Sequence, residues 1–210
     1  MAYTLYYAPG TASLAVHWAL IALGVPFDTH RLSLDAGDQR APAYLALNPA
    51  GRVPTLVVDG EPVAESVAIL MLLAERHPEA GLAPPPGSRE RAKWLETMVF
   101  IANGLQSAFR DWFYAVEDGG PDGADFVRAL ARLRIEAAWG RLDRQLAGRE
   151  FLFGEAPGAA DYLIAMHMRW SRNMPRPASA WPQLAALAAR MAALPTYAEL
   201  VGREAITPWP

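Results

Sequence analysis

The stretch YYAPGTASLAVHW, residues 6–18, decides how the first part of the chain is interpreted. A short strand-like run, residues 3–7, ends near Pro9-Gly10. Apolar residues then recur at helical spacing from Ser13 to Leu23, and Gly24 supplies a stop. A turn between a strand and a helix is a usual place for an anion or a reactive group. This turn carries no thiol, because the chain contains no cysteine.

The composition limits the classes of protein to which the chain can belong. A length of 210 residues allows one large domain or two small ones, and 52% hydrophobic with 20% charged residues is typical of a globular protein. A net charge of −3 gives no support for a nucleic-acid partner. No apolar run approaches about 18 residues, so we expect no membrane span. The first residues lack the charged region of a signal peptide, which predicts a cytoplasmic protein.

The first eighty residues alternate between strand and helix patterns. Residues 26–34 alternate with period two, and 41–47 form a short helical piece. Asp59-Gly60 lies between two strand-like runs and predicts a two-residue hairpin, whose second strand lies at a sheet edge because it contains Pro62. Residues 65–77 are apolar almost all round, as in a helix buried on more than one side. The order β-α-β-α-β-β-α predicts a small mixed sheet with flanking helices.

After this region the pattern becomes helical throughout. Residues 79–87 are rich in Pro and Gly and are predicted to be a linker. The chain is therefore divided into an α+β domain, residues 1–78, and an all-α domain, residues 88–210. Helices are expected near 88–116, 125–147, 159–172, 182–193 and 195–203.

Three segments carry a resemblance to a known family. LYYAPGTASLAVHWALIALGVPFD (5–28), NPAGRVPTLVVDGEPVAESVAIL (48–70) and FLFGEAPGAADYLIA (151–165) resemble the soluble glutathione transferases, most of all their bacterial branches. The resemblance implies a thioredoxin-like N-terminal half, a helical C-terminal half, glutathione as co-substrate and a homodimer. It also implies that Asp161 is the acid of a structural capping box.

The resemblance implies which residues bind glutathione. The family's counterpart of Pro54 is cis, which would direct the backbone of Val53 toward the peptide; the residues alone fit a trans turn equally well. Ser66 and Glu65 begin a helix, whose free N–H groups suit the γ-glutamyl carboxylate, although a plain helix cap also explains them. The implied binding residues are Arg52, Val53, Pro54, Glu65 and Ser66, with Arg52 for the glycyl carboxylate and Arg40 as a second choice.

The same resemblance changes the question about the missing thiol. Many bacterial relatives read Pro-Gly-Ala-Cys-Ser in this loop, whereas here Ala12 occupies the cysteine position and Gln106 stands where they often carry a histidine. The thiol can instead belong to glutathione, and lowering its pKa from about 8.5 by about two units would ionise most of it near neutral pH. The candidate donors are the hydroxyls of Ser13, Thr11 and Tyr7, or a backbone N–H acting alone.

The remaining expectations concern the second substrate and the reaction. The first long helix of the second domain is where the family binds its electrophile, so a pocket of Asn103, Gln106, Arg110 and Phe113 is expected. The four histidines lack metal-ligand spacing, so no metal is expected. The predicted reaction joins the glutathione thiolate to a small hydrophobic electrophile. The alternatives are a glutathione-dependent isomerase, lyase, dehalogenase or peroxidase, and a non-catalytic glutathione-binding protein.

Overall fold

The computed structural model describes residues 2–209, which form two compact units. The first unit contains the chain up to Ala83 together with Ala192–Trp209, and the second unit is Pro84–Met191. The sequence-based division at residues 78 and 88 stays a prediction. It differs from these units in one respect, since the last helix of the chain groups with the first unit rather than with the other late helices.

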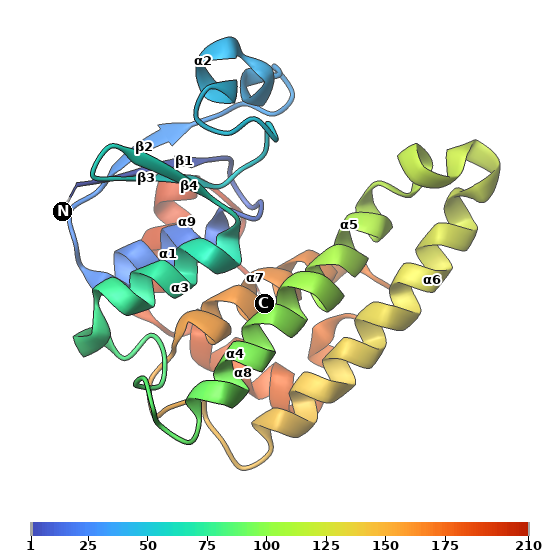
Figure 1. The fold of residues 1–210 in the computed structure, drawn as a ribbon. Helices are drawn as coiled ribbons and strands as arrows, with labels where there is room; N and C mark the ends of the chain where they lie inside the picture. The colour runs from blue at the N-terminus through green and yellow to red at the C-terminus, as the bar shows by residue number, and fades with distance from the viewer. Residues whose placement is uncertain (1, 210) are drawn as a thin grey trace. The chain divides into compact units, whose positions relative to one another are not determined.

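A four-stranded mixed sheet forms the centre of the first unit (Figure 1). Its strands are β1 (Tyr3–Tyr7), β2 (Asp28–Arg31), β3 (Thr55–Val58) and β4 (Glu61–Ala64), in the order β2-β1-β3-β4. β1 is parallel to β2 and antiparallel to β3, and β3 is antiparallel to β4. This is the predicted mixed sheet.

The predicted hairpin is confirmed. Val58 pairs with Glu61, so Asp59 and Gly60 alone connect β3 to β4, with φ of 52° and 96°. Positive φ at both positions is what a two-residue turn of this kind requires. Pro62 lies in β4, at the edge of the sheet, where its missing N–H costs no ladder bond.

Helices cover both faces of the sheet. In Figure 1, α1 and α3 lie against one face and α2 lies on the other side. All side chains from Leu14 to Ile21 are buried, which makes α1 the most enclosed element of this unit. The late helix α9 packs against α1, where the Trp18 indole donates to the Thr196 hydroxyl at 3.0 Å. The helices of this unit are α1 (Leu14–Leu23), η1 (Asp38–Arg40), α2 (Pro42–Leu45), α3 (Ser66–Arg76), η2 (Pro78–Ala80) and α9 (Pro195–Glu204).

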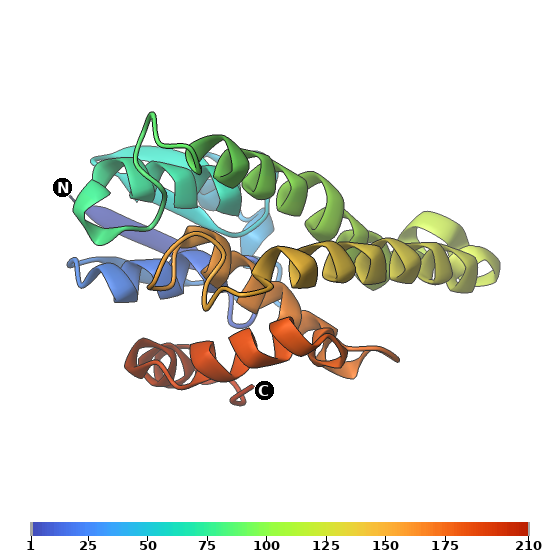
Figure 2. The same cartoon turned by 90° about the horizontal axis from the view of Figure 1, so that it is seen from below.

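The second unit is helical, as predicted. A first run of α4, the π-helical η3 and α5 lies antiparallel to the long α6 (Figures 1 and 2). Gly120, with φ 65°, breaks α6 just before Pro121. The elements are α4 (Arg91–Phe100), η3 (Ile101–Gln106), α5 (Ser107–Phe113), α6 (Ala115–Leu146), α7 (Ala159–Trp170), η4 (Ser171–Asn173), η5 (Ala178–Ala180) and α8 (Pro182–Ala192). No single helix among the described residues is long and apolar enough to cross a membrane.

Some of the apolar side chains that recur at helical spacing in this unit are exposed. Trp94, Met98, Phe109 and Trp139 form the core and are fully buried. Other apolar side chains on the same helices face solvent, so the helical spacing located the helices without showing which side chains are buried. The exposed set on α4 and α6 is Leu95, Val99, Val116, Phe126, Leu130 and Leu133, with exposed fractions of 36–69%.

Candidate functional site

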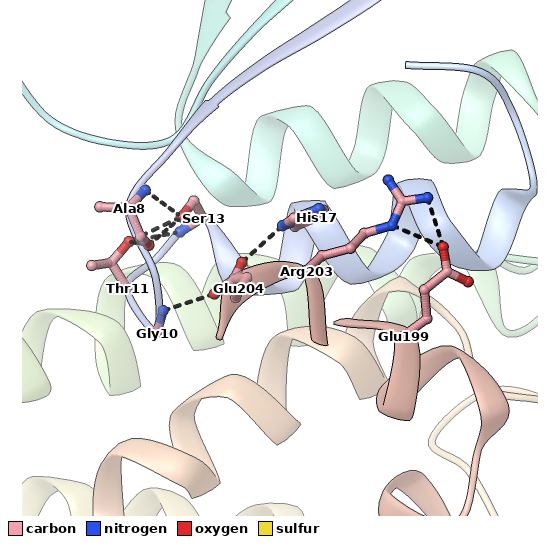
Figure 3. Close-up of polar contacts among 8 residues, drawn as sticks. All are labelled: Ala8, Gly10, Thr11, Ser13, His17, Glu199, Arg203 and Glu204. Carbon is pink, nitrogen blue, oxygen red and sulfur yellow. Dashed lines mark hydrogen bonds and ion pairs between the residues drawn. The ribbon is translucent and has the colours of Figure 1, made fainter. Parts of the chain in front are cut away.

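The turn after β1 is held by a cluster of short polar contacts (Figure 3). The Ser13 hydroxyl donates to the Ala8 carbonyl at 3.0 Å and accepts from the Ala8 N–H at 3.2 Å. The Thr11 hydroxyl also reaches the Ala8 carbonyl, at 2.7 Å, and lies 2.9 Å from the Ser13 hydroxyl. Gly10, with φ 69°, supplies the left-handed conformation that the turn needs. The two predicted hydroxyls therefore lie together.

The two hydroxyls differ in what they can reach. Ser13 is fully buried and already bonded to Ala8, so a contact with an external sulfur would require the turn to rearrange. Thr11 is partly exposed, although its hydroxyl also donates to the Ala8 carbonyl. Between them, the Ala12 N–H has no hydrogen-bond partner among residues 2–209 and stands one residue before the N-cap of α1. The donor left unbonded at this turn is therefore the Ala12 amide, and the partly exposed Thr11 hydroxyl can donate to a ligand by turning away from the Ala8 carbonyl.

Tyr7, the third candidate hydroxyl, ends β1 and is 6% exposed. Its ring packs edge-on against His17, with the ring centroids 4.9 Å apart. Burial raises the pKa of the Tyr7 hydroxyl, and the nearby Glu204 carboxylate raises it further. Tyr7 is thus a neutral core tyrosine beside the turn.

The start of α3 is joined to the same turn. The Ser66 hydroxyl is buried and donates to the Ala12 carbonyl at 2.9 Å. Glu65 precedes it at the N-cap, is exposed, and has φ 69° and ψ 111°, a strained backbone conformation for a residue with a side chain. The first turn of α3 itself carries no acidic residue, so Glu65 at the N-cap is the acid next to its free N–H groups.

The predicted cis peptide bond is present between Val53 and Pro54. A small network of buried side chains holds the backbone just before this bond. The Tyr44 hydroxyl donates to the Arg52 carbonyl at 2.5 Å, and the Asn48 amide donates to the same oxygen at 2.8 Å. Both side chains also contact the Thr55 hydroxyl. Sequence reasoning missed Tyr44 and Asn48, although Asn48 lies inside the NPAGRVP segment that was singled out.

Both candidate arginines are exposed, and they lie near the same loop. Arg52 precedes the cis bond, and the Arg40 guanidinium approaches Gly51 so closely that a Cβ there would lie 3.1 Å from its nitrogen. The Gln39 carbonyl would be only 2.9 Å from that Cβ, and Gly51 also has positive φ. Only glycine fits at this position, which allows Arg40 to approach the backbone next to Arg52.

Strand pairing brings these parts to one edge of the sheet. Tyr6 pairs with Thr55, so the end of β1 and the residues just before β3 are neighbours. The turn at Thr11–Ser13, the Val53–Pro54 bond and the start of α3 at Ser66 therefore converge. Six of the nine predicted first-unit residues belong to these three segments. Tyr7 and Arg52 directly adjoin them, and Arg40 ends η1 close to Gly51.

The four residues predicted for the electrophile lie in the second unit. Asn103 is exposed on η3, and Gln106 has a buried Oε1 without a hydrogen-bond partner among residues 2–209. Arg110 pairs with Asp118 and lies over the Tyr114 ring. Phe113 is 53% exposed.

An aromatic cluster surrounds Phe113. Its ring centroid lies 6.0 Å from that of Phe109 and 6.0 Å from that of Trp170 on α7. His167, one turn earlier on α7, joins the cluster and is fully buried. Sequence reasoning missed Trp170 and His167, because nothing local indicates that α7 meets α5. Within residues 2–209 no group of three or more His, Asp or Glu is arranged to hold a metal ion.

Comparisons with known proteins identify the family. The family model described as glutathione S-transferase, N-terminal domain, matches residues 1–75. Glutathione S-transferase GST-4.5 of Xanthomonas campestris pv. campestris is 34% identical over 175 residues, which are 80% of this chain and 82% of the relative. The chain belongs to the glutathione S-transferase family.

Two further similarities extend over nearly the whole glutathione S-transferase chain. Maleylacetoacetate isomerase of Pseudomonas aeruginosa is 30% identical over 201 residues, 91% of each protein. The structure of a sphingomonad glutathione S-transferase complexed with glutathione matches with a TM-score of 0.84 at 30% identity, covering 97% of this chain and 100% of that one. The fold class, a thioredoxin-like α+β domain followed by a helical region, is therefore confirmed.

Proposed function

We propose that this glutathione S-transferase binds glutathione in its first unit and transfers the glutathione thiolate to small hydrophobic electrophiles. The observation that carries the proposal is the convergence of the Thr11–Ser13 turn, the cis Val53–Pro54 bond and the start of α3 at one sheet edge. These segments offer free N–H groups, a hydroxyl and a helix N-terminus, the donors that a peptide carrying carboxylates and a thiolate requires.

Each part of glutathione has a binding partner in the proposal. The γ-glutamyl carboxylate meets the N-terminus of α3 at Ser66, and Glu65 meets the amine. The backbone of Val53 pairs with the peptide, and Arg52 with Arg40 holds the glycyl carboxylate. The sulfur lies over the Ala12 amide with the Thr11 hydroxyl beside it. This arrangement needs no protein cysteine, because the nucleophile enters with the co-substrate.

The choice of donor is tested by two substitutions at the turn. Thr11→Val removes the accessible hydroxyl, and we expect it to raise the kinetic pKa of the bound thiol by about one unit in a conjugation assay. Ser13→Ala removes a buried hydroxyl and is expected to lower stability by about 1 kcal/mol with an unchanged kinetic pKa. Thr29→Val, at an exposed position of β2, is the matched control. If only Ser13→Ala raised the kinetic pKa of the bound thiol, Ser13 rather than Thr11 would be the donor.

A specific observation favours isomerisation as a second candidate function. One relative that matches over 91% of its length carries the name maleylacetoacetate isomerase. An isomerase would use the same thiolate with a dedicated acceptor pocket. Turnover of maleylacetoacetate exceeding that of a chlorodinitrobenzene acceptor would favour it, whereas turnover of the aromatic acceptor alone would favour conjugation.

The second unit offers support for a hydrophobic acceptor. Phe113 and Trp170 form a partly exposed aromatic surface, which suits a flat apolar molecule. We propose that Phe113 contacts the acceptor, and that Asn103, Gln106 and Arg110 orient its polar groups. The Oε1 of Gln106 is buried without a hydrogen-bond partner among residues 2–209, and in this proposal the bound acceptor supplies the missing donor.

We further propose that the protein works as a cytoplasmic homodimer. The exposed apolar side chains along α4 and α6 support an interface between copies, since such a face is unfavourable in water. Leu130→Glu is expected to shift the protein toward monomer in sedimentation velocity, with Arg128→Glu as a charge-changing control on the same helix. A monomeric wild-type protein at micromolar concentration would contradict the proposal.

A further inference from the structure

The last residue of α9 contacts the turn of the candidate site directly. Glu204 is 1% exposed, and its Oε2 accepts a hydrogen bond from the Gly10 N–H at 2.8 Å (Figure 3). Its other oxygen, Oε1, lies 2.9 Å from Nδ1 of His17 on α1. One carboxylate thus joins three segments of the first unit, and its two partners lie 194 and 187 residues away along the chain.

A buried carboxylate is costly unless donors satisfy it. Glu204 has two, one from the turn and one from His17, whose Nδ1 must carry the proton to bond with a carboxylate. His17 is itself 1% exposed and lies between the rings of Tyr7 and Phe27, with centroid distances of 4.9 and 5.7 Å. The imidazole therefore has no freedom to turn away, and the carboxylate is held from two sides.

The peptide that Glu204 holds lies directly before the candidate donors of the turn. Gly10 directly precedes Thr11, which is partly exposed, and Ala12, whose N–H has no hydrogen-bond partner among residues 2–209. Holding the Gly10 N–H fixes the plane of the Pro9–Gly10 peptide, which lies two peptide units before the one that carries the Ala12 amide. The Ser66 contact to the Ala12 carbonyl holds the other side of the turn. Glu204 and Ser66 therefore fix the turn before and after the Ala12 amide.

We propose that Glu204 is a positioning residue for thiolate stabilisation: its carboxylate holds Gly10 so that the Ala12 amide and the Thr11 hydroxyl point at the glutathione sulfur. This inference rests on the proposed function. It adds that the C-terminal helix α9, although far from the turn in sequence, sets the pKa of the bound thiol through the backbone.

The direction of the effect separates positioning from simple electrostatics. A negative charge near the turn disfavours a thiolate, so removing the Glu204 charge alone would lower the thiol pKa. Loss of positioning acts in the opposite direction, because the sulfur loses its donors. The other ionisable groups around the carboxylate are Tyr7 from β1 and His17 from α1, while Arg203 and Glu199 on α9 pair with each other at 2.7 Å.

The test compares Glu204→Ala with Glu199→Ala, an exposed acid on the same helix. Both are assayed for the pH dependence of kcat/KM with glutathione, and for binding of S-methylglutathione, which has no ionisable thiol. We expect Glu204→Ala to raise the kinetic pKa by about one unit and therefore to lower kcat/KM about threefold near pH 7, approaching about tenfold at lower pH. S-methylglutathione binding should stay within about twofold, and Glu199→Ala should resemble wild type.

A double variant keeps the test decisive if Glu204→Ala does not fold. His17→Phe with Glu204→Leu replaces both buried polar side chains by apolar ones, a change that can be nearly neutral for stability. It leaves the Gly10 N–H without its acceptor, so the kinetic pKa should still rise. An unchanged or lowered pKa, or an equal loss of glutathione and S-methylglutathione binding, would overturn the positioning role. If the wild-type protein binds no glutathione at all, it is the proposed function that fails.

Discussion

Two buried histidines show how differently the two units use the same side chain. His17 on α1 and His167 on α7 are at most 1% exposed, and for each the Nε2 atom has no hydrogen-bond partner among residues 2–209. The Nδ1 of His17 contacts the carboxylate of Glu204, whereas the Nδ1 of His167 donates to the Leu163 carbonyl of its own helix at 2.8 Å. One histidine joins distant segments around the candidate site, and the other only completes its local helix.

The surroundings match these two roles. His167 lies against the rings of Phe109 and Trp170, with centroid distances of 5.6 and 5.0 Å. Burial lowers the pKa of His167 to about 4, so the ring stays neutral in the folded protein near neutral pH. An aromatic residue could fill the same space. His17 is harder to replace, because Glu204 would lose one of its two donors.

The largest expected effect is on His17. His17→Phe leaves the buried Glu204 carboxylate with the Gly10 N–H as its remaining donor, and we expect a loss of about 4 kcal/mol in the free energy of unfolding. Urea denaturation at pH 7 measures it. His30→Phe, at an exposed position of β2, is the control and should cost less than about 0.5 kcal/mol. Equal effects of the two substitutions would remove the contrast between the histidines.

His167 should show its effect through pH. Its pKa is about 4 in the folded protein and about 6.5 when unfolded, so the unfolded chain binds more protons between these values. Its contribution to stability is complete above pH 6.5 and is lost as the pH falls toward 4. The difference in unfolding free energy between wild type and His167→Phe should change by about 3 kcal/mol from pH 7 to pH 4.

Two features make this measurement selective for His167. Burial raises the pKa of Asp161 to about 6, so this residue titrates over the same range. Asp161 is present in both proteins, and its contribution therefore drops out of the difference in unfolding free energy. The substitution itself should be nearly neutral at pH 7, since the ring fits an aromatic cluster. A difference that does not vary with pH would show that His167 is not held neutral by burial.

A smaller effect is expected at Tyr44, whose hydroxyl holds the Arg52 carbonyl just before the cis bond. Tyr44→Phe removes the hydrogen bond to the Arg52 carbonyl and should cost about 1.5 kcal/mol of stability, with a roughly threefold weaker glutathione affinity in calorimetry. The neighbouring Tyr6→Phe is the control. Unchanged affinity would mean that the backbone before Pro54 does not depend on this network.

The smallest effect on stability is expected at Phe113, in the aromatic surface of the second unit. Phe113→Ala should lower the free energy of unfolding by about 1 kcal/mol, because half of the side chain faces solvent while the other half packs on Phe109 and Trp170. It should raise KM for an aromatic acceptor about fivefold and leave KM for glutathione unchanged. A rise in KM for glutathione instead would contradict the assignment of Phe113 to the second substrate.

The sequence predicted the local parts of this structure well. Pattern and turn chemistry located β1, the Asp59-Gly60 hairpin and the helices, and Gly24 has the expected left-handed conformation. Resemblance to the family added the cis bond at Pro54 and the capping acid Asp161, whose carboxylate accepts from the Gly158 N–H at 2.9 Å. Each of these features depends on residues close together in the chain.

Contacts between distant segments could not be predicted in this way. Nothing in the sequence near Gly10 indicates that Glu204 will be its partner. From the sequence alone, Glu204 is one more charged residue on an amphipathic helix. The spacing on α6 likewise could not show that Phe126 and Leu133 would be exposed. For the same reason Ser13 looked as available as Thr11, whereas the folded turn buries its hydroxyl.

The account is tested most directly by the ionisation of glutathione in the complex. Ultraviolet absorbance of the thiolate, followed against pH with the wild-type protein in excess, measures the pKa of the bound thiol. We predict a midpoint about two units below the value of about 8.5 for a free thiol. A bound thiol that titrates like free glutathione, or no binding at millimolar concentration, would contradict the claim that this turn ionises the co-substrate without a protein cysteine.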